Sequence, residues 1–172
     1  MTARTVFERR FSCRTFDTTP IDGDTIQALL EAGCWAANGG NLQPWRFVVV
    51  LEAVRRRELA GAAYSQSFLA KAPVVITVCA VPDESASKYG ARGRELYCLQ
   101  DTAAAAQNIL LAATDRGLGS CWVGAFDEAA VARVLDLPGS WRPVALIALG
   151  HPAETALQRS RRPLSEITLW YE

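Results

Sequence analysis

The chain has 172 residues, of which half are hydrophobic and 21% are charged, and its 18 lysines and arginines balance its 18 aspartates and glutamates. This length fits one globular domain over residues 1–172, and the composition is too apolar for a disordered chain. A zero net charge excludes a global positive field that would attract nucleic acid or anionic lipid, so any anion site must be local.

The number and spacing of the cysteines and histidines limit which metal sites, disulfides and catalytic groups the chain can form. The cysteines are odd in number, form no Cys-x-x-Cys motif and lie in apolar stretches, at Cys13, Cys34, Cys79, Cys98 and Cys121. This pattern predicts reduced core thiols in a cytoplasmic protein, and it fits neither a disulfide framework nor a zinc site. His151 is the single histidine, which we expect in a loop or at the surface, so a His-ligated metal site or a Ser-His-Asp triad lacks its residues. The N-terminus has no apolar signal core and no apolar run is long enough to span a bilayer, so we expect no membrane partner.

The first half of the chain alternates predicted helices and strands. Helical spacing of apolar residues and capping signals predict helices from Thr2 or Thr5 to Arg9, from a Pro20–Asp24 turn to near Trp35, and over Ala53–Ala63. Runs of β-branched residues predict strands over Arg46–Leu51 and Val74–Ala80.

A long helix dominates the second half. Only Gly93 interrupts the pattern from about Ala91 to Arg116, and Gly117 stands where a C-cap glycine belongs. Such a helix is roughly 35–40 Å long, so we expect it to be central. Its Ala103–Ala106 run either lets another helix approach closely, from this chain or a partner subunit, or merely favours helix formation. The remaining predicted elements are an extended piece over Ser120–Phe126, a helix over Glu128–Leu135, a strand over Pro143–Leu149 and a strand-like ending over Ile167–Tyr171.

The stretch Asn38–Trp45 is too polar and too rich in glycine for a core. It holds two glycines, three side-chain amides and a proline between a helix and a strand. Glycines permit a positive φ or a close backbone approach, and amides both donate and accept, which suits a planar heterocycle. The alternative is an ordinary helix-to-strand loop.

Basic residues gather near both ends of the chain. Arg10, Ser12 and Arg14 share one side of an extended segment, and so do Arg159 and Arg161. If the two groups meet in space, they form a local site for a phosphate; otherwise they are independent solvated charge runs. No Walker A or Gly-x-Gly-x-x-Gly motif accompanies them, which argues against a Rossmann phosphate loop.

Four motifs, taken in this order, resemble the FMN-dependent nitroreductase family. They are Arg10-Phe-Ser12-Cys-Arg14-Thr-Phe16, Gly40-Asn41-Leu-Gln43-Pro44-Trp45-Arg-Phe, Gly117-Leu-Gly119-Ser-Cys-Trp-Val-Gly124-Ala-Phe and Arg159-Ser-Arg161-Arg-Pro163-Leu164. The resemblance covers nearly the whole chain. It implies an α+β fold with a central, mostly antiparallel sheet, flanking helices and a long central helix, in an intertwined homodimer with flavin sites at the subunit interface.

The resemblance also implies cofactor-binding residues, and no metal ligands. Arg10 and Ser12, with Phe11 between them, match positions at the ribityl-phosphate side of FMN, and Arg14 matches a cation beside flavin N1 and O2. The other matches are a phosphate-binding pair at Arg159 and Arg161, backbone donors to N5 and O4 at Gly124 and Ala125, a loop from the other subunit at Asn38, Gly39 and Asn41, and a pyrimidine-reading amide at Gln66.

Two departures from the family pattern concern the ring surface. The family loop commonly has Pro-Ser where this chain has Ala37-Asn38, and the chain is shorter than many relatives between Cys79 and the long helix. The first departure alters the surface beside the ring. The second implies a more exposed flavin.

The implied reaction is carried by the flavin. FMN takes a hydride from NADH or NADPH at N5, and a flat electrophile, such as a nitroaromatic, quinone or enone, then enters the same cleft in a ping-pong cycle. No side chain needs to act as a catalytic acid or base; Arg14 and the Gly124 backbone support the flavin. Alternatives are a flavin-dependent dehydrogenase, dehalogenase or flavin-degrading enzyme, a flavin-binding or redox-sensing protein without turnover, and a generic anion- or nucleotide-binding module.

Overall fold

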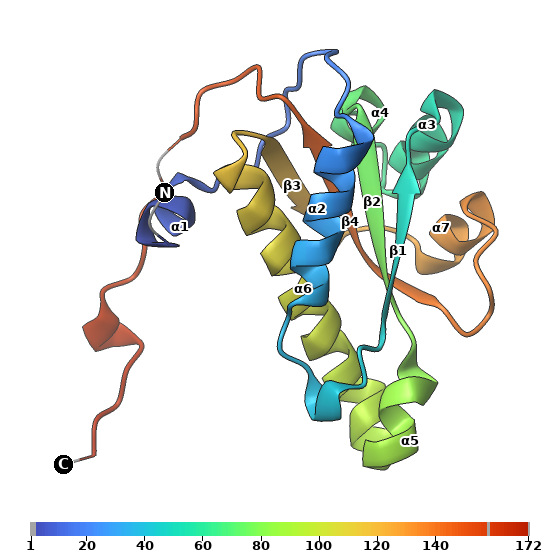
Figure 1. The fold of residues 1–172 in the computed structure, drawn as a ribbon, viewed down its shortest axis with the longest axis vertical. Helices are drawn as coiled ribbons and strands as arrows, with labels where there is room; N and C mark the ends of the chain where they lie inside the picture. The colour runs from blue at the N-terminus through green and yellow to red at the C-terminus, as the bar shows by residue number, and fades with distance from the viewer. Residues whose placement is uncertain (1–2, 158, 172) are drawn as a thin grey trace.

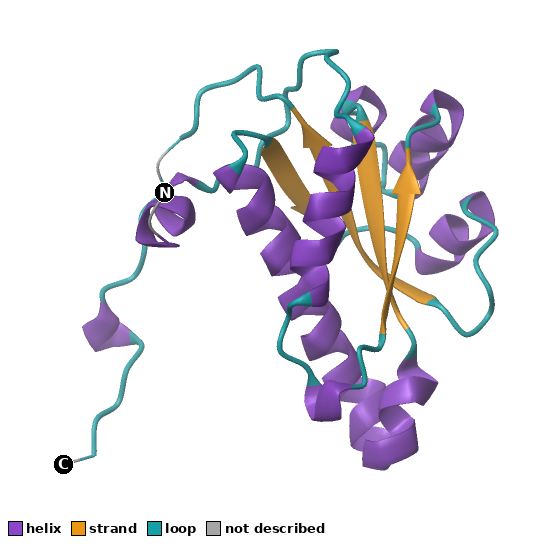
Figure 2. Ribbon diagram, in the orientation of Figure 1, coloured by secondary structure: helices purple, strands orange, loops and turns teal. Residues whose placement is uncertain are grey.

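The computed structural model describes residues 3–157 and 159–171. Its core is a four-stranded sheet in the order β1-β2-β4-β3, formed by β1 (Trp45–Val50), β2 (Val74–Ala80), β3 (Gly119–Val123) and β4 (Arg142–Gly150). All three strand pairs are antiparallel (Figure 2). The predicted α+β class and antiparallel sheet are therefore confirmed. The extended piece predicted over Ser120–Phe126 stops early, because the last strand residue is Val123.

Helices cover both faces of the sheet (Figure 1). One face packs against α2 (Gly23–Cys34) and α6 (Cys98–Asp115), and the other packs against α3 (Ala53–Ala62), α4 (Phe68–Lys71) and α7 (Glu128–Val134). Every residue of β2 is buried, with Ile76 and Val78 facing α2 and α6, and Val75 facing the opposite side. A strand covered on both faces is apolar throughout, which is why the sequence shows an unbroken apolar run there.

A small residue lets α2 lie close to α6. A Cβ placed on Gly33 would stand 3.1 Å from the side chain of Ile109, and the Asn108 amide donates to the Ala32 carbonyl over 3.1 Å. The close helix approach expected for the long helix therefore comes from the same chain. It is centred one turn beyond the Ala103–Ala106 run, whose Ala105 and Ala106 are fully buried.

The single helix predicted from Ala91 to Arg116 is wrong at its start. The structure instead has α5 (Pro82–Arg92), a π-helical turn (Gly93–Tyr97) and then α6. Gly90 breaks regular geometry with φ +56°, and a Cβ on Gly93 would lie 2.3 Å from the Ser85 carbonyl oxygen, so the turn requires glycine there. The predicted C-cap is confirmed: Gly117 has φ +74°, and the following N–H, of Leu118, donates to Ala113 O over 2.9 Å.

Residues 151–154 pair with the segment around Thr15, and the rest of the tail, drawn in red, extends away from the sheet (Figure 1). The tail's large apolar side chains are exposed. The described part of this tail contains the short 3-10 turn Leu164–Glu166. Residues Ile167–Tyr171 form no strand, so the predicted strand-like ending is wrong. Among the described residues, the sheet has four strands, and Ile167–Tyr171 pair with none of them. The short helices α1 (Ala3–Arg9) and α4 complete the fold; Thr2, a predicted start of the first helix, is outside the described residues, and α4 was not predicted.

The cysteines are all free, and four of them are buried, whereas Cys34 is exposed at the end of α2. The prediction of core thiols is thus confirmed except at Cys34. His151 lies in the loop directly after β4, as expected. Within the described ranges, no helix has the length and apolar character needed to cross a membrane.

Candidate functional site

The basic segment near the N-terminus runs along β3. Cys13 N donates to Ser120 O over 2.9 Å, and Ser12 forms an isolated parallel bridge with Ser120. Cys13 is fully buried while Ser12 and Arg14 are exposed, as alternation in an extended segment requires. The segment therefore presents Ser12 and Arg14 together to solvent.

Glu154 holds this segment in place from the other end of the chain. Its Oε1 accepts the N–H of Thr15 over 3.0 Å and also that of Arg14. Ala153 N donates to Thr15 O over 2.9 Å. The backbone donors, that of Arg14 above all, lower the pKa of Glu154, because they stabilise the ionised carboxylate. Glu154 was not predicted as a site residue, because nothing in its local sequence distinguishes it from a solvated glutamate.

The Arg14 guanidinium lies over the Phe68 ring, with 5.7 Å between its Cζ and the ring centroid. Burial raises the pKa of the Cys121 thiol, and the positive charges of Arg14 and Arg10 oppose that rise. Neither arginine belongs to an ion pair within the described part of the chain. Their charges are therefore available for an anionic ligand.

The segment after β3 joins the same area. Gln66 Nε2 donates to Ala125 O and to Ala63 O, in each case over 3.0 Å. Gly124 and Ala125 are exposed, and a Cβ on Gly124 would have only Trp122 Nε1 nearby, at 3.7 Å. Phe68, which lies under Arg14, follows Gln66 by two residues, so these contacts bring Arg14 and the Gly124–Ala125 backbone to one area of the surface. Arg10 and Ser12 lie on the same N-terminal segment as Arg14. Phe11, between Arg10 and Ser12, is partly buried against the core.

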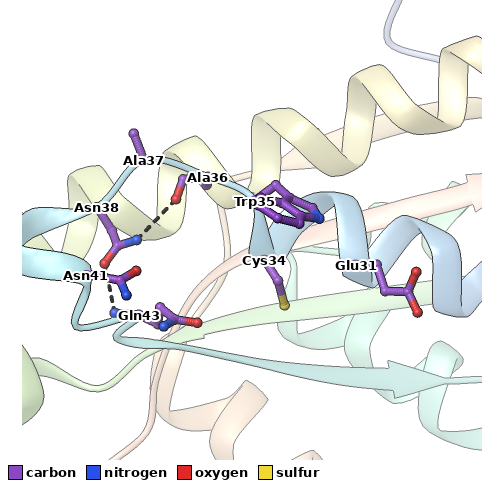
Figure 3. A pocket seen from close by; sticks show the side chains of 8 residues that line it. All are labelled: Glu31, Cys34, Trp35, Ala36, Ala37, Asn38, Asn41 and Gln43. Carbon is purple, nitrogen blue, oxygen red and sulfur yellow. Dashed lines mark hydrogen bonds between the residues drawn. The ribbon is translucent and has the colours of Figure 1, made fainter.

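The stretch Asn38–Trp45, called here the amide-rich loop, lines an open cavity of about 730 Å³ beside the end of α2 (Figure 3). The amide of Asn38 is used within the loop, since its Nδ2 donates to Ala36 O over 3.1 Å and its Oδ1 accepts Gln43 N over 2.9 Å. Asn41 has φ +56° and is exposed. Asn38 therefore braces the loop, and Asn41 and Gln43 present their amides to solvent. The cavity residues are Glu31, Cys34, Trp35, Ala36, Ala37, Asn38, Asn41 and Gln43.

A buried carboxyl anchors this loop to α6. Gly39 N donates to Asp101 Oδ1 over 3.1 Å, and Asp101 is only 7% exposed. Its other oxygen, Oδ2, is buried without a hydrogen-bond partner, and burial raises the pKa of the group. The sequence analysis missed Asp101, although it falls on the same helical face as the buried Cys98 and Ala105. A charged residue in such an apolar stripe is the signal that was available.

The loop and the basic segment lie at opposite ends of α6 (Figure 1). Asp101, which holds Gly39, is in the first turn of α6, whereas Ser120, which holds Cys13, follows its last turn. The 18 residues of α6 extend for about 27 Å. Within one chain, Asn38, Gly39 and Asn41 are therefore separated from Arg10, Ser12 and Arg14.

The tail arginines lie in an exposed segment after β4. Arg159 and Arg161 are exposed, and the Arg161 guanidinium donates to Arg159 O over 3.1 Å and to Ser160 O over 3.0 Å. Among residues 3–157 and 159–171, no hydrogen bond or ion pair connects them to Arg10 or Arg14. Two guanidinium groups do not bond to each other even where they flank one anion, so the meeting of the two arginine groups at a phosphate stays a prediction.

Large apolar side chains are exposed at several places around these elements. Trp35 beside the loop is 87% exposed and Trp170 in the tail is 80% exposed, and Leu164, Ile167, Leu169 and Tyr171 are exposed as well. Soluble monomers rarely leave so many large apolar groups in water. These surfaces are suited to contact with another chain.

Comparisons with known proteins agree on one relationship. A sequence profile described as "Nitroreductase family" matches residues 7–67 and 52–151. The chain is 31% identical over 153 residues to a protein named "Putative NADH dehydrogenase/NAD(P)H nitroreductase" from Archaeoglobus fulgidus, covering 87% of this chain and 84% of the relative. It is 30% identical over 171 residues to "5,6-dimethylbenzimidazole synthase" from Rhodospirillum rubrum, covering 87% and 81%. Among solved structures it is similar to the NADPH:FMN oxidoreductase from Vibrio harveyi complexed with NAD+, with a TM-score of 0.89 and 26% identity over 99% of this chain and 77% of that one.

Proposed function

Since the chain belongs to the nitroreductase family, we propose that it is an FMN-dependent oxidoreductase. It takes a hydride from NADH or NADPH and reduces a flat electrophilic acceptor, such as a nitroaromatic, quinone or enone, in a ping-pong cycle. The Vibrio harveyi neighbour supports the cofactor and donor, because it is an NADPH:FMN oxidoreductase in complex with NAD+. The observation that carries the proposal is the convergence of Arg14, Gln66 and the Gly124–Ala125 backbone on one exposed area.

These residues fit FMN by the chemistry they present. Arg10 and Arg14 are cations without a carboxylate partner in the described residues, which suits a phosphate and an electron-rich ring edge. The exposed backbone at Gly124 has room for a flat ring because no side chain covers it. Bound FMN supplies hydride transfer between the nicotinamide and the acceptor.

The protein's own groups bind and orient. Arg14 is fixed by Glu154 at its backbone and by Phe68 at its guanidinium, so its charge is held at a defined place. Gln66 is fixed by its two bonds to backbone carbonyls, and its Oε1 remains able to accept a hydrogen bond from a ring N–H. No side chain of this group has to take up or release a proton.

The complete site requires two copies of the chain. The loop residues Asn38, Gly39 and Asn41 are at the far end of α6 from Arg14, so a partner subunit supplies them. Arg159 and Arg161 lie on an arm whose apolar residues are uncovered in one chain, and we place this arm on the partner as well. Such a homodimer buries Trp35 and Trp170 and brings the two basic groups to one phosphate.

A second candidate reaction is breakdown of the flavin itself. The Rhodospirillum rubrum relative is named for the synthesis of 5,6-dimethylbenzimidazole, a compound with the same dimethyl-substituted benzene ring as flavins. Flavin breakdown would consume the bound cofactor, whereas acceptor reduction regenerates it.

One experiment tests the proposal and separates the two reactions. The absorption spectrum of the purified protein, loaded with FMN, is recorded before and after anaerobic addition of NADH or NADPH, and again after an acceptor such as a quinone. The proposal predicts that the flavin band bleaches and then returns. A band that never bleaches contradicts it, and a band that bleaches but is lost on exposure to oxygen favours flavin breakdown.

A further inference from the structure

The end of α5 and the following π-helical turn lie over the glycines of the amide-rich loop. A Cβ on Gly40 would stand 2.7 Å from Lys88 Nζ and 2.8 Å from the Tyr89 hydroxyl. A Cβ on Gly39 would stand 3.3 Å from the Tyr89 ring and 3.8 Å from the Tyr97 ring. The two glycines thus make room for a cation and two aromatic rings beside the loop.

Two cations in this segment are each held on a tyrosine. Lys88 Nζ lies 5.5 Å from the centroid of the Tyr89 ring, and Arg92 Cζ lies 5.4 Å from that of Tyr97. Arg92 Nε also donates to the Tyr97 hydroxyl over 3.1 Å, and the two rings meet edge to face with 5.1 Å between centroids. These contacts restrict two otherwise flexible side chains, which lowers the entropy lost when they bind a ligand. We name the two cations and their two tyrosines, Lys88, Tyr89, Arg92 and Tyr97, the Lys88–Arg92 cluster.

The positive charge of the cluster is not neutralised by its own helix. The acidic residues at the start of α5 are occupied elsewhere, since Glu84 pairs with Arg46 and Asp83 pairs with Arg94. Lys88 and Arg92 are exposed and take part in no ion pair within the described ranges. Asp101, the buried carboxyl at this loop, accepts from Gly39 N. Two cations, each lying on one ring of a contacting pair of tyrosines, therefore face solvent in a chain with a net charge of zero.

We propose that the Lys88–Arg92 cluster binds an anionic group, a carboxylate or phosphate, carried by a substrate whose flat ring lies at the site to which loop Asn38–Asn41 belongs. The inference rests on the proposed function, because the loop lies beside a flavin only in the proposed dimer. Cations that are already oriented favour oxyanions over neutral analogues of the same shape. The anion belongs either to the acceptor, as in an aromatic carboxylate, or to the 2′-phosphate that distinguishes NADPH from NADH.

The test uses ligands that undergo no redox reaction, so its result does not depend on turnover. Binding of benzoate, and of its neutral counterpart benzamide, is measured by calorimetry on the FMN-loaded protein. Adenosine 2′,5′-bisphosphate and adenosine 5′-monophosphate form the second pair. The variant is Lys88→Gln with Arg92→Gln, and the matched control is Arg57→Gln with Arg116→Gln, which removes two exposed positive charges on α3 and just after α6.

In each pair the second ligand, benzamide or adenosine 5′-monophosphate, is the reference, because it lacks the carboxylate or the 2′-phosphate under test. The cluster variant is expected to weaken binding of benzoate or of the bisphosphate by about tenfold, the effect of two exposed charge contacts, while binding of the matching reference, and binding to the control variant, change less than about twofold. Loss of benzoate binding assigns the anion to the acceptor, and loss of bisphosphate binding assigns it to NADPH. Unchanged binding of both benzoate and the bisphosphate, or equal weakening of one of them and its reference, overturns the inference. So does a wild-type protein that prefers neither anion. Failure of the proposed function is seen separately, as a flavin band that NAD(P)H does not bleach.

Discussion

Gly39 donates its backbone N–H to Oδ1 of Asp101 over 3.1 Å, and this bond fastens the amide-rich loop to the first turn of α6. The bond joins the short 3-10 turn Gly39–Asn41 of this loop to α6, the longest helix among the described residues. Because Asp101 is buried, it connects the position of the predicted flavin-binding loop to the stability of the core.

Substitution of Asp101 separates the role of its acceptor oxygen from that of its charge. Asp101→Asn retains an oxygen for Gly39 N–H and is expected to keep wild-type stability at acid pH. Asp101→Ala leaves the donor without its partner and is expected to cost about 1–3 kcal/mol. Urea unfolding of both variants checks this, and equal stability of the Ala variant would show that the bond contributes nothing.

The same carboxyl gives the stability a pH dependence. Burial raises the pKa of Asp101, so the folded protein holds this proton more tightly than the unfolded chain does. As pH rises from the ordinary carboxyl range through the raised pKa, the wild-type protein therefore loses stability relative to Asp101→Asn. Unfolding free energies of the two proteins between about pH 4 and about pH 7 test the sign, and a difference that is flat or of opposite slope contradicts it.

Glu154 is expected to act on cofactor binding through Arg14. Removing its carboxylate in Glu154→Ala frees the backbone of Arg14 and Thr15, so the FMN dissociation constant should rise by about three- to tenfold. Glu154→Gln keeps one acceptor oxygen and should recover part of the loss. Fluorescence titration with FMN measures both, and wild-type FMN affinity in both variants would remove Glu154 from the site.

Two neighbouring arginines of the tail allow a test substitution and a matched control. Arg161→Ala is expected to weaken FMN binding by about 2–3 kcal/mol, the contribution of a charged hydrogen bond to phosphate. Arg162→Ala removes the same charge one residue later, on the other side of an extended segment, and should change affinity much less. Unchanged FMN affinity in Arg161→Ala would exclude the tail from the site.

Gly93 is expected to be irreplaceable for packing. A Cβ at this position meets the Ser85 carbonyl at 2.3 Å, so Gly93→Ala forces the π-helical turn away from α5 and should cost about 1–3 kcal/mol. Gly61→Ala in α3 is the control, because a Cβ there meets nothing within 4 Å and alanine favours the helix. Thermal unfolding of both variants tests the contrast.

The sequence predicted those helices, strands and caps that are determined by residues close together in the chain. The unbroken apolar run of β2 and the Gly117 cap could be recognised without the structure because burial on two faces and a left-handed turn each demand particular residues. The helix α5 was missed because its apolar positions are few, and its boundary depends on Gly93 packing against Ser85, which no spacing rule contains.

The candidate site was predicted as residue types but not as an arrangement. Alternation placed Ser12 and Arg14 on one side of their segment, yet the contacts that hold Arg14, from Glu154 and Phe68, come from distant parts of the chain. The strand-like ending at Ile167–Tyr171 was wrong because its apolar residues have no partner in a single chain. Sequence patterning indicates that a segment will be covered, but it does not state by which chain.

The proposed function depends most on a flavin site built from two chains, and complementation between two variants tests this directly. One variant carries Arg10→Ala and Arg14→Ala, and the other carries Asn38→Ala and Asn41→Ala. The two chains are unfolded together, refolded and loaded with FMN, and NAD(P)H-dependent bleaching of the flavin band is then measured. Each variant alone should be inactive, whereas the mixture should recover about a quarter of wild-type bleaching, since half of the dimers are mixed and each of these has one intact site. A mixture no more active than its parents would contradict a site shared between subunits.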